Sequence, residues 1–323
     1  MAYSAEVLRK AKMRLDTMRS DRQSLQQQRL HSAYEAQPRL REIDRLLRLS
    51  MAEAARAVFA QSEDAHAMME KVRQENQALQ REREAILQAN FPKDYLQEGP
   101  VCEICGGVGY IGAEMCQCLQ SLCREEQRKR LTLLSCGTAS FSDFRLDYYP
   151  NTIDPKYGAI PRAVMEKTYD YCRKYAASFS PDSGNLLFVG GTGLGKTMLS
   201  ACIATEVTEK GYCVSYESAG HLFSKLEKNR FNPTEESHTA VAEIENADLL
   251  IIDDLGTELP GNFVTAALYT LINDRILAGK PTIISTNLNA QEITQRYSPQ
   301  IASRLRGTYR LLTFVGEDIR LKK

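Results

Sequence analysis

The stretch from Gly190 to Thr197 constrains this sequence most, because it reads G-x-x-x-x-G-K-T directly after an apolar run. Four glycines within six residues let the backbone bend through conformations closed to other residues, so that its N–H groups can converge on phosphate oxygens. Lys196 is expected to reach the β and γ phosphates, and the Thr197 hydroxyl to bind Mg²⁺. A structural glycine turn is the alternative, but the order of strand, loop and helix signals favours phosphate binding. The predicted nucleotide contacts are Gly190, Gly191, Thr192, Gly193, Leu194, Gly195, Lys196, Thr197 and Met198.

Short apolar runs alternate with helical stretches after residue 184, which predicts an α/β core with a parallel sheet flanked by helices. A further helix is expected before this core, over residues 161–177. Ligands bind beyond the carboxyl ends of the strands in such sheets, so polar residues at those ends are the site candidates. The expected strands are residues 186–189, 213–216, 249–253, 282–285 and 311–314.

Polar residues at these strand ends complete a predicted catalytic set. Asp253 is expected to bind Mg²⁺ and Asp254 to orient an attacking water, although two acids could also mark an ordinary strand-to-loop transition. Asn287 can hydrogen-bond the γ-phosphate or the water, whereas an isolated asparagine there would be a turn former. Arg304 and Arg320 are candidates to neutralise charge that develops during phosphoryl transfer. With Lys196, the predicted catalytic residues are Asp253, Asp254, Asn287, Arg304 and Arg320.

The front of the chain is expected to be helical, because residues 3–90 contain no glycine and only one proline, Pro38. Apolar residues recur at helical spacing in three successive segments. A self-contained helical hairpin or bundle and a docking arm for another protein explain such stripes equally well. The stripes are Leu8, Ala11, Leu15, Met18 and Leu25, then Leu40, Ile43, Leu47, Met51, Ala54 and Val58, and finally Val72, Leu79 and Ile86.

Four of the nine cysteines form two close pairs, with ten residues and several glycines between the pairs. This pattern suits a tetrahedral Zn²⁺ site of structural type, because four thiolates leave no open position for catalysis. A redox dithiol is the alternative for the first pair, but no thioredoxin-like pattern surrounds it. The expected zinc ligands are Cys102, Cys105, Cys116 and Cys118; Cys123 is expected on a helix face, and Cys136, Cys172, Cys202 and Cys213 in the core.

Charge is balanced over the whole chain, with 41 basic and 41 acidic residues, so any contact with nucleic acid has to be local. A helix expected over residues 119–134 carries a basic patch that fits a solvated face or a phosphate-backbone contact. The patch is Arg124, Arg128, Lys129 and Arg130. The sequence has neither an apolar run of membrane-spanning length nor the apolar core of a signal peptide at its N-terminus, so a cytoplasmic protein is expected.

Five motifs resemble, in order, those of the AAA+ ATPases of the bacterial DnaC and DnaI replicative helicase loaders and their IstB-like relatives. They are residues 190–197, 249–258, 285–288, 303–305 and 318–320. The resemblance implies an AAA+ P-loop NTPase in which Asn287 is the first sensor, Arg304 reaches ATP in a neighbouring subunit and Arg320 is the second sensor in its own subunit. Asp254 stands where many AAA+ proteins have glutamate. The resemblance also implies that helices over about residues 218–246 grip single-stranded DNA, where Phe223, Lys225, Lys228, Arg230 and Phe231 have suitable chemistry.

The helical and cysteine-rich front end is similar to the N-terminal part of these loaders, which docks on the hexameric helicase. The expected organisation is a coiled-coil-like docking region over residues 1–98, a zinc-binding module with a basic helix over 99–135, and the AAA+ ATPase domain over 136–323. We therefore expect an ATP-dependent loader of the replicative DNA helicase onto single-stranded DNA during replication initiation, which self-associates through its AAA+ domain and uses ATP, Mg²⁺ and Zn²⁺. The alternatives are an IstB-like ATP-binding helper of a transposase, a P-loop kinase, and a non-enzymatic adaptor in which ATP is structural.

Overall fold

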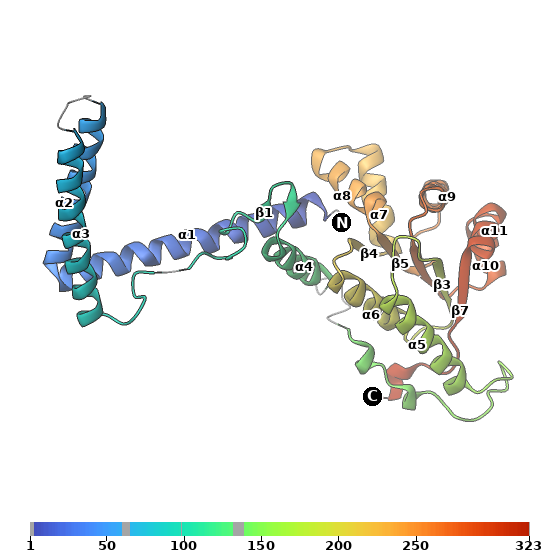
Figure 1. Ribbon diagram of the computed structural model, residues 1–323. Helices are drawn as coiled ribbons and strands as arrows, with labels where there is room; N and C mark the ends of the chain where they lie inside the picture. Colours follow the sequence, from blue (N-terminus) through green and yellow to red (C-terminus); the bar gives the residue numbers. More distant parts are fainter. Residues whose placement is uncertain (1–2, 60–64, 98, 132–138, 323) are drawn as a thin grey trace. The chain divides into compact units, whose positions relative to one another are not determined.

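The computed structural model divides into two compact units. One unit comprises residues 12–119, and the other comprises residues 1–11 together with residues 120–323. Long helices dominate the first unit, and a parallel sheet with helices on both faces forms the core of the second (Figure 1). The structure describes residues 3–59, 65–97, 99–131 and 139–322.

Three long helices occupy the front of the chain, as the sequence predicts. Pro38 begins the second helix, where its missing N–H costs nothing because the first turn of a helix has no acceptor for it. The second and third helices pack against each other as a hairpin (Figure 1) and are joined by an ion pair of 2.7 Å between Arg83 and Asp44. This packing agrees with the hairpin interpretation of these two stripes, and it leaves their exposed faces free for the docking interpretation. The helices are α1 (Ala5–Ala36), α2 (Pro38–Phe59) and α3 (Ala65–Asn90).

The apolar stripe of α1 is buried over a shorter length than the sequence predicts. Ala11 and Leu15 are buried, whereas Met18 and Leu25 are each 41% exposed. Two leucines of α2 outside its predicted stripe, Leu46 and Leu49, are 38% and 50% exposed. The side chains of Met51, Ala54 and Val58 lie outside the described residues.

A parallel five-stranded sheet organises the second unit, as predicted, in the order β4-β5-β6-β3-β7. This order places β3 beside β6 and β6 beside β5, so the polar residues that follow these strands meet at one edge of the sheet. The last strand begins two residues earlier than predicted, because Tyr309 and Arg310 already pair with β3. The strands are β3 (Asn185–Val189), β4 (Val214–Ser218), β5 (Leu249–Leu255), β6 (Thr282–Thr286) and β7 (Tyr309–Thr313).

Helices cover both faces of this sheet because alternate strand residues point to opposite sides. Leu186 and Phe188 of β3 belong to a core with α5 and α6, and Leu187 belongs to a second core with α7, α9 and α11. No helix in the described part of the chain is long and apolar enough to cross a membrane. The helices of this unit are α5 (Pro161–Ala177), as predicted, α6 (Lys196–Glu209), α7 (Ala219–Phe231), α8 (Glu235–Asn246), α9 (Asn262–Leu277), α10 (Ala290–Arg296) and α11 (Pro299–Thr308).

Candidate functional site

The glycine-rich loop joins β3 to α6 and needs its glycines. Gly193 and Gly195 have left-handed backbones, with φ of 70° and 87°, which L side chains rarely adopt. A Cβ on Gly193 would overlap the Asp318 carboxylate, and one on Gly195 would lie 2.9 Å from the Tyr149 hydroxyl. Two flanking segments fix the loop, because Tyr149 donates to the Leu194 carbonyl (2.9 Å) and the Ile319 N–H donates to the Gly193 carbonyl (3.1 Å).

Lys196 begins α6 with its ammonium group held at the loop. The side chain is 5% exposed, and Nζ donates to the carbonyls of Gly190 (2.8 Å) and Gly191 (2.6 Å). Burial lowers the pKa of Lys196, and the nearby carboxylates of Asp254 and Asp253 oppose that shift. A buried cation is thus held at the glycine-rich loop by two backbone carbonyls, next to the start of α6, where free N–H groups and the helix dipole favour a bound phosphate.

The two acids at the end of β5 lie within a local irregularity of the sheet. The pairing of β5 with β6 shifts register between Ile252 and Leu255, and Asp254 has a left-handed backbone with φ of 55°. A bulge of this kind redirects side chains, so that Asp253 is buried while Asp254 is exposed. Aspartate tolerates the left-handed region better than most residues.

Ser285 of β6 and Tyr216 of β4 hold the buried acid in place. The Ser285 hydroxyl donates to Asp253 Oδ1 and accepts a hydrogen bond of 2.9 Å from the Asp254 N–H. The Tyr216 hydroxyl donates to Asp253 Oδ2 at 2.9 Å. Both carboxylate oxygens therefore have neutral donors, which fix their direction without neutralising the charge that a divalent cation would need. No pattern in the sequence assigned these roles to Tyr216 and Ser285.

The electrostatic environment links Asp254 to the loop and to the C-terminal segment. Loss of hydration and the neighbouring Asp253 raise the pKa of Asp254, whereas Lys196 and Arg320 lower it. Arg320 also acts on Lys196, lowering its pKa. Lys196 and Asp254 therefore lie within electrostatic range of each other and of two further predicted residues, Asp253 and Arg320.

Of the remaining predicted residues, Asn287 lies at the same edge of the sheet as the two acids, whereas Arg304 lies elsewhere on the domain. Thr286, directly before Asn287, accepts a hydrogen bond of 3.3 Å from the Gly190 N–H, so the asparagine follows a residue that touches the loop. Thr197 occupies the first turn of α6, one residue after Lys196. Arg304 is exposed on α11, and the structure records no contact between it and the other predicted site residues among those described.

The middle of this unit matches a known family. Residues 173–307 match the model described as IstB-like ATP binding protein. This part of the chain is therefore similar to an IstB-like ATP-binding domain. With its P-loop between β3 and α6 and its parallel five-stranded sheet, this domain has the AAA+ fold.

Curated relatives of the chain include replication and insertion-sequence proteins. The replicative helicase loader DnaC of Escherichia coli strain K12 is 25% identical over 134 residues, which cover 42% of this chain and 55% of that protein. A putative insertion sequence ATP-binding protein of Sinorhizobium fredii is 34% identical over 98 residues, covering 30% of this chain and 32% of that protein. The chain thus spans at most about half the length of these relatives.

Solved structures that resemble this chain include DnaC and DnaI. A crystal structure of the DnaC helicase loader has a TM-score of 0.46 and 21% identity, and covers 55% of this chain and 97% of that one. A crystal structure of DnaI has a TM-score of 0.44 and 21% identity, and covers 56% of this chain and 90% of that one.

The residues expected to contact DNA divide into buried and exposed groups in the IstB-like domain. Phe223 is 4% exposed and belongs to the core, so the expectation that it stacks on a base was wrong. Lys225 pairs with Glu217 at 2.6 Å. Phe231 is 70% exposed at the end of α7 and lies 5.6 Å from the ring of Phe263, a residue of α9 that the sequence did not single out. Lys228 and Arg230 are exposed beside it.

The basic helix α4 (Gln117–Leu131) uses part of its predicted patch for contacts within the protein. Arg128 pairs with the Glu209 carboxylate at the end of α6, and Arg124 donates to the Glu209 carbonyl at 3.4 Å. Lys129 pairs with Glu126 on its own helix at 2.7 Å. These contacts favour a structural role over a phosphate contact for Arg124 and Arg128. The side chain of Arg130 lies outside the described residues.

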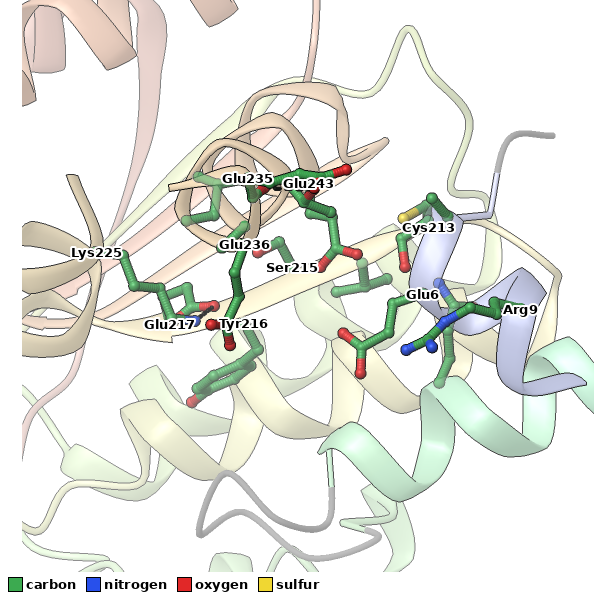
Figure 2. Close-up of a pocket in the computed structure, with 17 residues that line it drawn as sticks. Glu6, Arg9, Cys213, Ser215, Tyr216, Glu217, Lys225, Glu235, Glu236 and Glu243 are labelled. Atoms are coloured by element: carbon green, nitrogen blue, oxygen red, sulfur yellow. Dashed lines mark hydrogen bonds and ion pairs between the residues drawn. The ribbon is translucent and has the colours of Figure 1, made fainter. Parts of the chain in front are cut away.

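A cavity of about 910 Å³ opens beside β4 and is distinct from the IstB-like nucleotide loop (Figure 2). Carboxylates outnumber cations in its lining, so it repels a triphosphate. Tyr216 lies in its wall and also reaches Asp253, so the cavity and the nucleotide site share one residue. The charged lining residues are Glu6, Glu217, Glu235, Glu236 and Glu243, against Arg9 and Lys225.

The four predicted zinc ligands converge. Their sulfur atoms all lie within 4.8 Å of one another, with 3.7 Å between Cys102 and Cys116 and 3.4 Å between Cys105 and Cys118. A tetrahedron of thiolates 2.3 Å from Zn²⁺ has sulfur atoms about 3.8 Å apart, so the cluster fits this metal. The Gly109 N–H donates to the Cys105 sulfur at 3.2 Å. Two short strands, β1 (Tyr110–Ile111) and β2 (Glu114–Met115), lie between the first and the second cysteine pair.

The remaining described cysteines do not join this cluster. Cys172, Cys202 and Cys213 are buried, as expected for core residues, and Cys123, which was expected on a helix face, lies on α4 and is buried as well. Cys136 lies outside the described residues.

Proposed function

We propose that this protein is an AAA+ ATPase that loads a replicative DNA helicase onto single-stranded DNA during replication initiation. One observation carries the proposal: the Tyr216 hydroxyl lies 2.9 Å from the Asp253 carboxylate and 3.5 Å from the Thr197 carbonyl, so the buried acid at the end of β5 lies beside the loop that holds Lys196, in a part of the chain similar to IstB-like ATP-binding proteins. With Asp254 and Arg320, this gives one loop cation, two strand-end acids and a second cation, a combination that suits binding and hydrolysis of a nucleoside triphosphate. The similarity to DnaC supports the helicase as the client.

Each residue has a proposed role in hydrolysis. Thr197 and Asp253 hold Mg²⁺, which neutralises charge on the transferred phosphate. Lys196 leaves its two loop carbonyls for the β and γ phosphates, and Asp254 orients the attacking water. Asn287 hydrogen-bonds that water or the γ-phosphate, and Arg320 stabilises charge from its own subunit.

Arg304 is proposed to complete the site of a neighbouring copy of the chain. Its side chain is exposed and lies away from the cluster in its own subunit, as a residue that acts on another subunit must. Self-association through the AAA+ domain then follows ATP binding, because the triphosphate supplies the charge that this arginine contacts.

The front of the chain is proposed to serve the client. The α2–α3 hairpin and the rest of residues 1–98 form the helicase-docking region, and residues 99–135 form a module in which Cys102, Cys105, Cys116 and Cys118 bind structural Zn²⁺. Residues 136–323 then form the ATPase domain. Lys228, Arg230, Phe231 and Phe263 are proposed to contact single-stranded DNA through phosphates and stacked bases. The protein is proposed to act in the cytoplasm.

A transposase helper is the second candidate function. The IstB-like model and the similarity to an insertion sequence ATP-binding protein favour it, since the same ATPase can serve a different client. We expect the helicase to be the client because the helical hairpin and the cysteine module add a second, separate surface to the ATPase.

Capture experiments with the full-length protein separate the two functions. The immobilised protein is incubated with ATP and either a hexameric replicative helicase or an IS21-type transposase, and the Lys196→Ala protein serves as the nucleotide-free control. Retention of the helicase and not the transposase supports the loader. Retention of the transposase alone contradicts it.

A further inference from the structure

Glu258 is a buried carboxylate that the hydrolysis scheme does not use. It lies three residues after the end of β5, and the whole residue is 7% exposed. A buried carboxylate is costly unless charged or hydrogen-bonding groups surround it. Glu258 therefore has to be held by specific partners, and these partners identify what the residue does.

The partners of Glu258 come from two different parts of the domain. Gly256, within the loop after β5, donates its N–H to Glu258 Oε2 at 2.9 Å. Arg296 and Tyr297, at the end of α10, approach the other oxygen: Arg296 Nε lies 3.3 Å from Oε1, and the Tyr297 hydroxyl donates to the same atom. Arg296 also donates to the Glu258 carbonyl. One side chain thus fastens the loop after β5 to the end of α10.

The same loop is fastened to the strand end that carries Asn287. Thr286 donates its hydroxyl to the Leu255 carbonyl at 2.6 Å. Leu288 packs on Gly256, where an added Cβ would lie 2.7 Å from its side chain. These contacts connect the loop after β5 directly to the strand end that carries Asn287.

The end of α10 leads directly into the helix that bears Arg304. Ser298 follows Tyr297 and caps α11, accepting a hydrogen bond of 3.2 Å from the Ile301 N–H. Arg304 lies on α11, which packs against α10 (Figure 1). The position of Tyr297 therefore determines where α11 begins, and with it the position of Arg304 on the surface.

We propose that Glu258 is a positioning residue that ties the γ-phosphate side of one subunit's nucleotide site to α11, and so sets where Arg304 is offered to the neighbouring subunit. This proposal rests on the proposed function, because it requires Arg304 to act on another subunit's ATP. It adds a regulatory contact: an empty site and an ATP-filled site would present Arg304 differently.

A subunit-mixing experiment tests the proposal in full-length protein. The donor is Asp254→Asn, which binds ATP and offers Arg304 but does not orient the attacking water; the acceptor is Arg304→Ala, which binds ATP but offers no arginine. Each is expected to be inactive alone, and an equimolar mixture is expected to hydrolyse ATP. Glu258→Gln is then placed in the donor or in the acceptor, and kcat and KM of the mixture are measured.

The predicted result depends on which subunit carries the change. Glu258→Gln in the donor lowers kcat at least about tenfold with KM unchanged, because a misplacement of about 1 Å at a reacting centre can cost about a hundredfold. The same change in the acceptor lowers kcat less than about threefold, since the acceptor's own Arg304 is absent. Equal losses in both positions, or no loss in the donor, overturn the proposal.

Two further variants separate positioning from folding. Tyr297→Phe in the donor removes the hydroxyl that bonds to Glu258 but keeps the ion pair between Glu258 and Arg296. It is therefore expected to lower kcat as well, by a smaller factor than Glu258→Gln does. Glu292→Gln is the matched control, because Glu292 is an exposed acid of α10 that bonds only to the helix start at Asn289. If the Tyr297→Phe donor performs as well as the Glu292→Gln donor, the proposal fails.

Failure of the proposal is distinguishable from failure of the ATPase function. If donor and acceptor do not complement each other although the unmodified protein hydrolyses ATP, Arg304 does not act between subunits and the proposal is wrong while the ATPase stands. If the unmodified protein does not hydrolyse ATP with helicase and DNA present, the proposed function is wrong as well.

Discussion

The Ser285 hydroxyl contacts both acids at the end of β5. It donates to the Asp253 carboxylate and accepts from the Asp254 N–H at 2.9 Å, so it supports both the buried metal ligand and the left-handed residue after it. Asp253 has a second neutral donor in Tyr216. The direction of the metal ligand is thus set by two hydroxyls from neighbouring strands.

Ser285→Ala is expected to raise the Mg²⁺ concentration needed for half-maximal ATP turnover by at least about tenfold, because a hydrogen bond to a charged group contributes about 1.5–3 kcal/mol. Binding of ATP without Mg²⁺ should change little. Ser200→Ala is the matched control, since the Ser200 hydroxyl is buried in α6 without a hydrogen-bond partner among the described residues. An unchanged Mg²⁺ requirement in Ser285→Ala contradicts the assigned role.

Asp254 makes the proposed hydrolysis sensitive to pH. Its carboxylate has to be ionised to orient water, and its pKa is raised from 3.8 by lost hydration and by Asp253. As the pH falls, kcat/KM for ATP hydrolysis should therefore drop when Asp254 becomes protonated. This drop should occur at a higher pH than it would for an aspartate with the ordinary pKa. Arg320→Gln should move this acid limb further upward, because Arg320 lowers the pKa of Asp254.

Asp254→Asn supplies the companion measurement at neutral pH. It should lower kcat by roughly a hundredfold or more, as expected for loss of a group that acts on the water, while ATP binding persists. Turnover comparable to that of the unmodified protein would assign the water to another residue.

At the scale of elements, the cysteine cluster is expected to depend on its metal. The module has only two-residue strands and little core of its own, so Zn²⁺ should hold Cys102, Cys105, Cys116 and Cys118 together. The purified protein should contain one Zn²⁺ per chain by elemental analysis, and Cys116→Ser should lose most of it. Cys123→Ala should retain it, because this buried cysteine lies outside the cluster. Equal zinc content in both variants contradicts the site.

The sequence predicts elements well where one local pattern suffices. The phosphate loop, the acid-ended strand β5 and the helix Pro161–Ala177 all follow from motifs or spacing within a few residues. Contacts between strands and helices far apart in the chain have no such signal. The hydrogen bond from Ser285 to Asp253 spans 32 residues and the one from Tyr297 to Glu258 spans 39, so neither role could be assigned beforehand.

Helix faces set a second limit on sequence prediction. Phe223 and Phe231 share one helix and one chemistry, yet the first is buried in the core and the second is 70% exposed. Successive helix positions turn by about 100°, so a small error in the assumed face exchanges a core residue for a surface one. Phe263, a half-buried residue of α9, forms the aromatic pair with Phe231 and was missed for the same reason as the long-range contacts.

At the scale of the whole molecule, client binding and ATP turnover are expected to be separable. Leu46 and Leu49 are exposed on α2, so Leu46→Glu with Leu49→Glu should leave folding and ATP turnover intact. Capture of the helicase should weaken at least about tenfold, because loss of a central interface side chain costs about 2 kcal/mol or more. Arg48→Glu, a change on another face of α2, is the control. If the double-leucine variant and the Arg48→Glu control capture the helicase equally well, the face with Leu46 and Leu49 does not bind it.

The central claim is that ATP held at the glycine loop drives transfer of a helicase to DNA. The most direct measurement is the amount of replicative helicase that remains on closed circular single-stranded DNA after a salt wash, compared for the unmodified protein and Lys196→Ala. The account predicts stable loading with the unmodified protein and ATP, and loading near the loader-free background with Lys196→Ala. Equal loading by the two proteins would contradict it.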